Sequence, residues 1–262
     1  MENKRVVVAM SGGIDSSMTA KRMVDAGYDV YGIYLKLHGR EESHAHNISN
    51  IEKVAKYLGI KYEIIGLEKS FMEFVVNPFV ERYKNGLTPN PCTFCNREIK
   101  FGALSAFAKE RGYGYLATGH YVNCDGEFFY EALDMSKDQS YFLCQLSQEQ
   151  LRYALFPIGD LLKPEVRRIA AEQGLATAKR KDSQGICFVG KVDLPAFLQQ
   201  KLASKKGNVH EILPSWPKYD RALAGAAAKA ENAAGPGTSD ARTNSTLSTE
   251  NRAIPAEADA EV

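Results

Sequence analysis

The fold is decided by one stretch, VVVAMSGGIDSS, which occupies residues 6–17. An apolar run typical of a buried parallel strand leads through two glycines into residues that open a helix. Such a turn points backbone N–H groups and a helix N-terminus at an anion, and glycines let the main chain approach a phosphate closely. Asp15 is better placed as a capping or Mg²⁺-organising carboxylate than as a phosphate partner, because two anions repel. The loop has neither a Walker A ending nor the GxGxxG pattern of a dinucleotide fingerprint.

Composition bounds the class of protein. The 262 residues are enough for one large domain with a sizeable core. The net charge of +1 is uneven, with −3 from Asp220 onward and +4 before it, which is compatible with nucleic acid. No apolar run approaches a membrane span, and a core strand begins almost at once, so we expect a cytoplasmic protein with no signal peptide and no membrane partner. The five cysteines indicate thiols, metal ligands or catalytic groups rather than a disulfide scaffold.

Strands alternate with helices in the first half of the chain. We expect strands at 5–9, 29–37, 61–67 and 113–118, and helices at 15–26, 47–58, 69–84 and 96–111. The helix at 69–84 is expected to be interrupted at Asn77-Pro78, and Asn96 is the expected N-cap of the helix that follows. This order predicts an α/β fold, a parallel sheet with helices on both faces. Gly12-Gly13, Leu35 and Gly119-His120 fall at the carboxyl ends of strands, where such sheets bind ligands.

The second half of the chain is less regular. A hairpin is predicted from 121–124 and 127–133 around Asp125-Gly126, with helices at 147–154, 163–173 and 193–202 and a short strand at 185–189. From about Ala222 the composition is rich in Ala, Gly, Ser, Thr, Asn and Glu without apolar periodicity, so 222–262 is predicted to be disordered.

Four further motifs carry chemistry. They are NPCTFCNREIKF at 90–101, ATGHY at 117–121, SKDQSYFL at 136–143 and DSQGICF at 182–188, the last following Lys179-Arg180-Lys181. Cys95 directly precedes a predicted helix, whose N-terminus favours the nucleophilic thiolate. Arg97 and Lys100 add positive potential.

Together with Ser-Gly-Gly-x-Asp-Ser, these motifs in this order resemble the tRNA-specific 2-thiouridylase family (MnmA type) of the PP-loop ATP pyrophosphatase superfamily. The similarity extends from about Arg5 to Ile212. It implies an adenine-nucleotide alpha-hydrolase-like (PP-loop) domain at 1–203 that binds ATP and transfers sulfur. It further implies the start of a truncated β-barrel domain at 204–221, ahead of the low-complexity tail at 222–262.

The resemblance also implies the site residues. The phosphates of ATP would be held by Ala9, Met10, Ser11, Gly12, Gly13, Ile14, Asp15 and Ser16, and adenosine by Leu35 and Gly119. Cys95 and Cys187 match the two catalytic cysteines. Asn90, Pro91 and Cys92 match the segment that meets the target base, and Lys137, Asp138 and Gln139 a segment that contacts tRNA.

The implied reaction is ATP-dependent 2-thiolation of the wobble uridine of tRNA, a sulfurtransferase activity. ATP with Mg²⁺ would adenylate the uridine O2, pyrophosphate would leave, and sulfur from a Cys95 persulfide would displace AMP. A sulfur-relay protein would deliver the persulfide. Cys187 would then either form a disulfide with Cys95 or release sulfide from it, because a persulfide that gives up its terminal sulfur needs a resolving thiol. Basic residues near the site, Lys179-Arg180-Lys181 among them, would hold the phosphate backbone.

Metal binding is a second interpretation of some of these residues. Cys92 stands where many members of the family carry Asp, so Cys92, Cys95 and Cys187 also offer three thiolates to a 4Fe–4S cluster. A structural zinc is the least favoured, because there is no second CxxC. His38, His44 and His46 offer a further metal site, although a solvated loop is the favoured interpretation of residues 37–46.

Two other functions remain open. One is a PP-loop adenylating synthetase that acts on a small metabolite; the paired cysteines oppose it, because adenylation followed by amine attack needs no thiol. The other is a truncated, non-catalytic paralogue that binds ATP or tRNA, which is supported by the fading of the similarity soon after Ile212.

Overall fold

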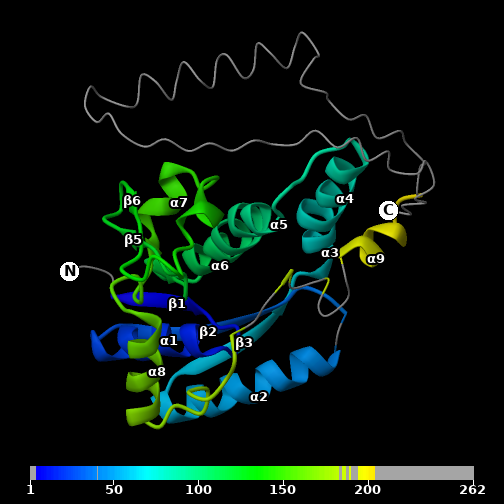
Figure 1. Cartoon of the computed structure of the whole chain (residues 1–262). Helices are drawn as coiled ribbons and strands as arrows, with labels where there is room; N and C mark the ends of the chain where they lie inside the picture. Colours follow the sequence, from blue (N-terminus) through cyan, green and yellow to red (C-terminus); the bar gives the residue numbers. More distant parts are fainter. Residues whose placement is uncertain (1–3, 40, 183–184, 187–188, 190–193, 204–262) are drawn as a thin grey trace, which may run out of the picture. The chain divides into compact units, whose positions relative to one another are not determined.

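Five parallel strands form the central sheet (Figure 1). They are β1 (Arg5–Ala9), β2 (Asp29–Lys36), β3 (Lys61–Gly66), β4 (Tyr115–Ala117) and β7 (Ala154–Leu155), in the order β3-β2-β1-β4-β7. The computed structural model describes residues 4–203, except 40, 183–184, 187–188 and 190–193. Within these residues the predicted α/β fold is confirmed.

Helices cover both faces of the sheet (Figure 1). One face carries α1 (Ile14–Asp25) and α2 (Glu41–Leu58), and α8 (Lys163–Glu172) packs on α1. Over the other face the chain forms α3 (Glu68–Phe71), the π-helix η1 (Met72–Val76), α4 (Asn77–Lys84), α5 (Pro91–Phe94), the π-helix η2 (Cys95–Leu104) and α6 (Ser105–Glu110).

The valines of β1 feed the cores on both faces. Val6 and Val8 pack in one cluster with side chains of α1 and α2, whereas Val7 packs with Phe101 and Leu104 of η2. Successive residues of a strand point to opposite faces, so a strand covered on both sides needs an unbroken apolar run. This is why VVVA lies at the centre of the sheet, and why the glycine loop (Met10–Gly13) that follows it begins on a rigid support.

The predicted interruption at Asn77-Pro78 takes the form of a π-turn. The chain continues from α3 through η1 into α4 without a gap, and the widened turn lies directly before Pro78. Proline lacks an N–H and its ring crowds the preceding turn, so an i→i−4 ladder cannot pass through it unchanged.

The helix predicted at 96–111 was placed wrongly at its start. It begins at Pro91, with Asn90 as N-cap, and runs through α5, η2 and α6 to Glu110. The Asn90 side chain accepts a hydrogen bond from the backbone N–H of Cys92 at 3.0 Å, and proline suits the first helical position. Asn96 is therefore not a cap, and Cys95 lies inside the helix rather than ahead of it.

The second half of the His-rich segment is helical rather than a loop. Helix α2 covers Glu41–Leu58, so it begins before the predicted residue 47. His44 is buried, with Nδ1 2.6 Å from the Tyr34 hydroxyl and Nε2 2.5 Å from the His38 carbonyl, and its ring stacks on that of His38. Both ring nitrogens are thus used in hydrogen bonds within the fold, which leaves none to ligate a metal.

The remaining elements are short. The predicted hairpin is confirmed as β5 (Asn123–Cys124) and β6 (Phe129–Tyr130), with Gly126 at φ 93°. The 3₁₀-helix η3 (Ser140–Leu143) and α7 (Gln148–Arg152) follow, and residues 154–155 belong to β7 rather than to the predicted helix 147–154. In the predicted strand 185–189, the described residues Gly185, Ile186 and Val189 form no strand, and α9 spans Leu194–Gln199.

The strand order reverses beside β1. Strands β2 and β3 lie on one side of it, and β4 and β7 on the other. In open α/β sheets ligands bind at such a switch point, beyond the carboxyl ends of the two central strands. The glycine loop follows β1 and residues Thr118–His120 follow β4, so the fold places the two segments at this point.

Candidate functional site

The glycine loop needs glycine at its centre for two reasons. Gly12 has φ +74°, which side chains disfavour, and a Cβ there would lie 2.6 Å from the backbone oxygen of Asn47 in α2. Gly13 is the N-cap of α1, and the hydroxyls of Ser16 and Ser17 donate to its carbonyl at 3.1 and 2.8 Å. The predicted strand–loop–helix geometry is therefore present, with a helix N-terminus at its end.

Asp15 does not cap the helix. Its carboxylate accepts the Tyr121 hydroxyl at 3.0 Å and the Lys163 ammonium at 2.7 and 2.8 Å. Burial, and then the Asp15 carboxylate beside it, raise the pKa of Tyr121, so its hydroxyl stays protonated and donates. Of the two roles suggested by the sequence, capping is excluded, and the organisation of Mg²⁺ stays a prediction.

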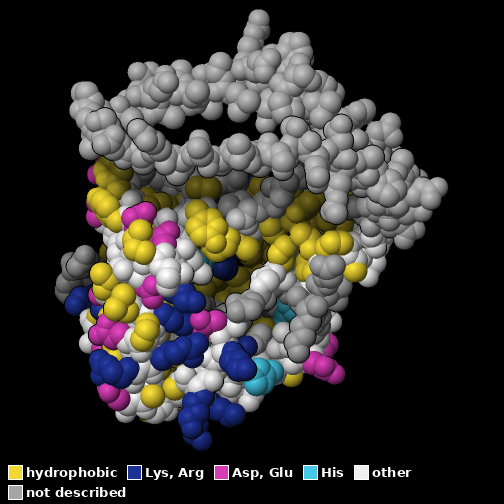
Figure 2. Space-filling model, viewed as in Figure 1, with side chains coloured by type: hydrophobic (Ala, Val, Ile, Leu, Met, Phe, Trp, Pro, Cys, Tyr) yellow, Lys and Arg dark blue, Asp and Glu magenta, His cyan; other side chains and the backbone are white. Residues whose placement is uncertain are grey.

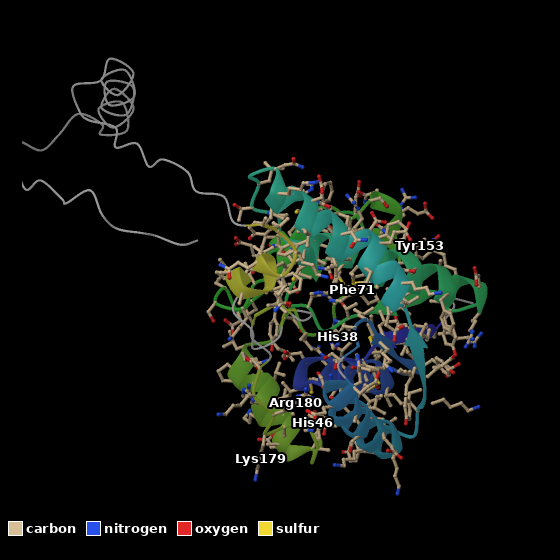
Figure 3. The ribbon with its side chains drawn as sticks, turned by 90° about the vertical axis from the view of Figure 1, so that its right-hand side faces the viewer. His38, His46, Phe71, Tyr153, Lys179 and Arg180 are labelled. Carbon is tan, nitrogen blue, oxygen red and sulfur yellow. The ribbon has the colours of Figure 1, made fainter. Side chains whose placement is uncertain are left out.

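Arg180 lies on the outer side of the same loop. Its guanidinium donates to the Gly12 carbonyl at 2.5 Å and to Oδ1 of Asn47 at 2.6 Å. Figure 3 shows Arg180 and His46 close together at the start of α2, while Lys179 points away from the fold. One member of the basic triplet is thus part of the loop's surroundings, and its neighbour Lys179 is exposed.

The segment after β4, Thr118–His120, contacts both the first turn of α1 and Lys100 of η2. A Cβ on Gly119 would lie 2.9 Å from the Ser16 nitrogen, so glycine lets this segment rest on the first turn of α1. The next residue, His120, lies with Nδ1 2.8 Å from the Thr118 hydroxyl and Nε2 3.4 Å from the Lys100 ammonium. Burial, and then Lys100, hold the pKa of His120 well below its ordinary value, so the ring is neutral and accepts from Lys100.

Lys100 lies on the same continuous helix as Cys92 and Cys95, the two cysteines of the CxxC motif. Main-chain pairing in a π-helix joins residues five apart, which brings Lys100 one turn along η2 from Cys95. Cys95 is buried and packs with Phe94 and Ile99, and Leu35 at the end of β2 packs on the same cluster. Burial raises the pKa of the half-buried Cys92 thiol, while Lys100 acts to lower it. The helix N-terminus beside Cys92 adds to the effect of Lys100.

A side chain from outside the helix supports the π-turn. The Gln150 amide nitrogen donates to the carbonyls of Arg97 at 2.8 Å and of Phe101 at 3.1 Å. Gln150 is held in turn by the capping box of α7, in which its Oε1 accepts the Ser147 N–H. The widened helix that carries Cys95 and Lys100 is therefore fixed from α7.

An exposed aromatic ring stands near Cys92. Tyr141 in η3 is 56% exposed, and Phe142 beside it accepts the Asn96 amide through its carbonyl at 3.0 Å. Burial, and then the neighbouring Cys92, raise the pKa of Tyr141. Helix η3, which carries Tyr141, packs on α5, which carries Cys92. The Asn96 side-chain oxygen is buried and has no hydrogen-bond partner among the described residues.

In the predicted tRNA segment, Asp138 and Gln139 form hydrogen bonds within the fold, and Lys137 is exposed. Asp138 accepts the Ala132 N–H at 2.8 Å and the Ser140 hydroxyl at 2.6 Å, and Gln139 accepts the Tyr121 N–H at 3.1 Å. Lys137 is exposed, with its ammonium 3.7 Å from Asp182. Contact with tRNA by Lys137, Asp138 and Gln139 stays a prediction.

Metal binding is not supported by the described residues. They include no group of three or more His, Cys, Asp or Glu side chains placed to hold a metal ion. Cys187 lies outside the described residues, so its role as second catalytic cysteine and the three-thiolate cluster both stay predictions. In the same part of the chain, no helix combines the length and apolar character needed to cross a membrane.

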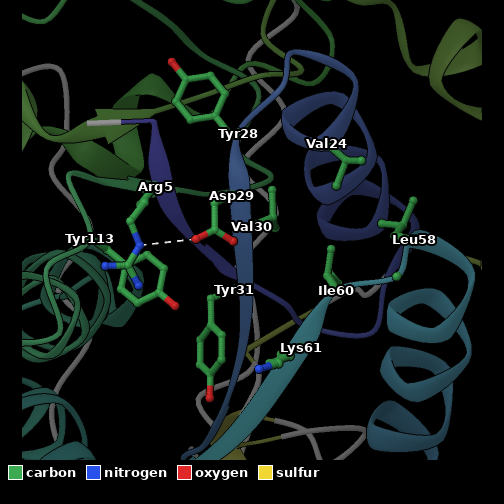
Figure 4. A pocket seen from close by; sticks show the side chains of 11 residues that line it. Arg5, Val24, Tyr28, Asp29, Val30, Tyr31, Leu58, Ile60, Lys61 and Tyr113 are labelled. Carbon is green, nitrogen blue, oxygen red and sulfur yellow. Dashed lines mark hydrogen bonds and ion pairs between the residues drawn. The ribbon is translucent and has the colours of Figure 1, made fainter. Parts of the chain in front are cut away.

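A pocket at the far end of the sheet is a different feature. It is lined by the first residues of the strands, including Arg5, Asp29 and Lys61, and by Tyr28 and Tyr31 (Figure 4). Arg5 and Asp29 form an ion pair across it at 3.2 Å. Because it lies at the amino ends of the strands, it is remote from the switch point.

Sequence reasoning missed three residues that complete the site: Asn47, Gln150 and Lys163. It singled out Asp182 as part of a motif, but not as a partner of Lys163. From the sequence alone, a lysine at the start of a helix is expected to be solvated, and only the fold brings Lys163 to Asp15.

Figure 2 shows Lys and Arg side chains gathered over the lower part of one face, and hydrophobic side chains over the upper part.

Fold and site together define an α/β domain of the PP-loop class. A family model described as "tRNA methyl transferase HUP domain" matches residues 4–191. The chain is 47% identical over 232 residues to the tRNA-specific 2-thiouridylase MnmA of Flavobacterium johnsoniae, covering 83% of this chain and 59% of that protein. It is 52% identical over 189 residues to the one from a Nitratiruptor species, covering 71% and 56%. The chain belongs to this family, and it spans just over half the length of these curated relatives.

Among solved structures, the chain resembles the predicted subunit of a tRNA methyltransferase from Methanocaldococcus jannaschii. The TM-score is 0.43 at 22% identity, over 64% of this chain and 74% of that one. The fold assignment rests on the sheet and on the family model.

Proposed function

We propose that this chain carries the ATP-binding and sulfur-transfer part of an enzyme that converts a tRNA uridine to 2-thiouridine. The observation that carries the proposal is the segment Thr118–His120. Gly119 rests on the first turn of α1, beside the glycine loop, and His120 contacts Lys100 on the cysteine helix. One short segment therefore links a phosphate-type loop to a pair of cysteines.

The glycine loop fits the phosphates of ATP. Gly12 and Gly13 have no Cβ to block an approach, and the first turn of α1 directs N–H groups outward. Arg180 and Lys163 add two cations at the loop. Asp15 offers carboxylate oxygens, the ligand type that Mg²⁺ prefers. Leu35 packs on the cluster that includes Cys95, and its predicted contact with adenosine supports a nucleotide site over the carboxyl ends of β1 and β2.

In the proposed reaction, Cys95 and Cys187 carry out the transfer of sulfur. The uridine O2 attacks the α-phosphate of ATP, and pyrophosphate leaves. The terminal sulfur of a Cys95 persulfide then bonds to carbon 2, and the former O2 departs with AMP. The Cys95–sulfur bond breaks as the Cys187 thiolate attacks Cys95, which leaves a disulfide for an external reductant. Lys100 supplies positive charge to this end of the site.

The tRNA and the sulfur donor are the proposed partners. Aromatic side chains stack on unpaired RNA bases, and the exposed ring of Tyr141 near Cys92 is suitably placed to do so. Lys137, and Lys179 on the basic triplet, are exposed cations that suit the phosphate backbone. A sulfur-relay protein would load Cys95.

One observation favours a second candidate. The chain matches 59% and 56% of the lengths of the two relatives, so the similarity covers only part of either protein. The alternative is a chain that binds ATP or tRNA without turnover. It differs from the proposal in one measurable respect, the appearance of 2-thiouridine.

Paired cysteine variants test the proposal. Cys95→Ser should abolish 2-thiouridine formation on unmodified tRNA while ATP binding measured by calorimetry stays within about twofold, because serine cannot carry a persulfide. Cys144→Ser is the matched control, since Cys144 is exposed and lies outside the site. Product formed by Cys95→Ser would overturn the assignment.

A further inference from the structure

Lys163 is a buried cation between two carboxylates that come from distant parts of the chain. Its side chain is 8% exposed, and its ammonium lies 2.7 Å from Asp15 and 2.9 Å from Asp182. Asp15 belongs to the first turn of α1, whereas Asp182 follows the basic triplet. The ammonium thus joins two segments that are 167 residues apart in sequence.

Both ends of Lys163 are fixed. Its backbone N–H donates to the Asp134 carboxylate at 2.9 Å. Asp134 thus caps α8 in place of Leu162, the N-cap residue, whose side chain makes no capping hydrogen bond. The ring of Tyr121 lies 5.4 Å from the ammonium and adds a cation–π contact. A long, flexible side chain loses much entropy when it is held this way, so its position indicates a specific role.

The segment that contains Asp182 meets the glycine loop a second time. Arg180 bonds the Gly12 carbonyl and Asn47, as described above. The Asp182 carboxylate also forms an ion pair with Arg167 of α8 at 2.6 Å. Residues 180–182 are therefore fastened to the loop by Arg180 and by the Asp182–Lys163–Asp15 bridge, and in sequence they lead on toward Cys187.

We propose that Lys163 is a positioning residue that ties residues 180–182 to the glycine loop, so that occupation of the loop and placement of this segment are coupled. The occupant is taken to be ATP, and in this the inference rests on the proposed function. A phosphate at the loop adds negative charge beside Lys163 and Arg180, so that both cations are held more firmly in place. Lys163 and Arg180 then contact the nucleotide and also join residues 180–182 to the loop. Occupation of the loop therefore affects the placement of the segment that leads to Cys187.

The basic triplet offers a direct readout. Trypsin cleaves after Lys179, Arg180 and Lys181, and backbone held against the fold resists cleavage. In Lys163→Met we expect cleavage at the triplet to rise about tenfold, because one partner of a buried ion pair has been removed. ATP should slow cleavage of the native protein severalfold and leave that of Lys163→Met unchanged.

Two further variants separate positioning from general loss of stability. Lys163→Arg keeps the charge and should restore resistance and the ATP effect. Lys163→Met/Asp15→Asn removes the carboxylate that Lys163→Met leaves without a cation, since Asp182 keeps Arg167, so the unfolding temperature should recover while cleavage stays fast. Arg168→Met is the matched control, since Arg168 lies on the same helix, is exposed and pairs with Glu172.

The outcomes are distinct. Equal cleavage rates in the native protein, Lys163→Met and the double variant would overturn the tie. Faster cleavage in Lys163→Met, with ATP protecting both proteins equally, would overturn the coupling. If Lys163 governs cleavage but ATP protects neither protein, the tie stands and the coupling fails. ATP binding measured by calorimetry then shows whether the proposed nucleotide function fails as well.

Discussion

Gly12 illustrates how much a single residue contributes to the loop. Gly12 and Gly27 both have positive φ, at +74° and +77°, so alanine at either should cost about 1–2 kcal/mol of folding free energy. Only at Gly12 would the new Cβ meet a neighbour, the Asn47 oxygen at 2.6 Å; nothing lies within 4 Å of one at Gly27. We expect urea unfolding to show a larger loss for Gly12→Ala, by more than about 1 kcal/mol, together with lost ATP binding.

In that comparison Gly27→Ala is the control for backbone strain alone. Equal losses of stability in the two variants, with ATP affinity retained in both, would mean that the close approach of Asn47 does not constrain the loop.

His120 predicts a pH dependence of stability. Its pKa is lowered in the folded state, first by burial and then by Lys100, so the folded protein keeps the ring neutral. The unfolded chain binds a proton as pH falls through about 6.5. The contribution to stability is therefore fully present above that pH and is lost below it, by at most about 1.4 kcal/mol per pH unit.

Unfolding in urea between pH 8 and pH 5 measures this effect, with His120→Gln as the comparison. The native protein should lose stability more steeply below pH 6.5 than the variant does. Parallel curves for the two proteins would show that His120 does not bind its proton differently in the two states.

The residues of the loop itself were open to prediction, whereas their partners were not. Gly12 and Gly13 after an apolar strand have a local physical cause. Lys163 lies 148 residues from Asp15, and only packing of α8 on α1 brings them together. The position of Arg180 on Gly12 likewise depends on tertiary structure. The predicted roles of Cys187 and of Lys137, Asp138 and Gln139 stay untested.

At the scale of one helix, Gln150 predicts how the π-turn is held. Gln150→Glu keeps the Oε1 acceptor of the capping box but places an oxygen against the carbonyls of Arg97 and Phe101. We expect a loss of about 1–3 kcal/mol and faster hydrogen exchange in residues 95–104.

Gln148→Glu is the matched control for this change. Gln148 also donates its amide to a carbonyl, that of Glu127, but at an exposed position. If both variants exchange residues 95–104 at the native rate, Gln150 does not hold the π-turn.

The elements show where sequence patterns succeed. The strands 5–9, 29–37 and 61–67 were predicted from their apolar residues, and the observed β1, β2 and β3 match them closely. Strand β1 is a buried run, whereas β3 is only partly covered. The start of the cysteine helix was missed because Pro and Asn are signals for both a turn and a helix N-terminus. The π-helical character of η2 has no sequence signature, since it depends on Gln150 from α7.

At the scale of the whole molecule, residues 4–203 should be sufficient for folding. Among the residues that the structure describes, the four hydrophobic clusters are built from residues between Val6 and Phe197. A chain that ends at Ala203 should therefore unfold within about 2 °C of the full chain in calorimetry. A decrease of more than about 5 °C would mean that residues 204–262 contribute to this core.

The proposed activity of the whole molecule depends on two ends of one site. The glycine loop and the cysteine helix come from different layers of the fold, and Thr118–His120 is the segment that touches both. A site for adenylation alone would need only the glycine loop, and a site for thiol redox chemistry alone would need only the cysteine helix. Their junction is what favours thiolation after adenylation.

The most direct test of this account is a thiolation assay on unmodified tRNA. Anaerobically purified protein would be supplied with ATP, Mg²⁺ and a persulfide donor, and the nucleosides analysed by mass spectrometry. We predict 2-thiouridine that requires ATP and appears with an equal amount of AMP. Absence of 2-thiouridine while ATP still binds would contradict the account and favour the non-catalytic alternative.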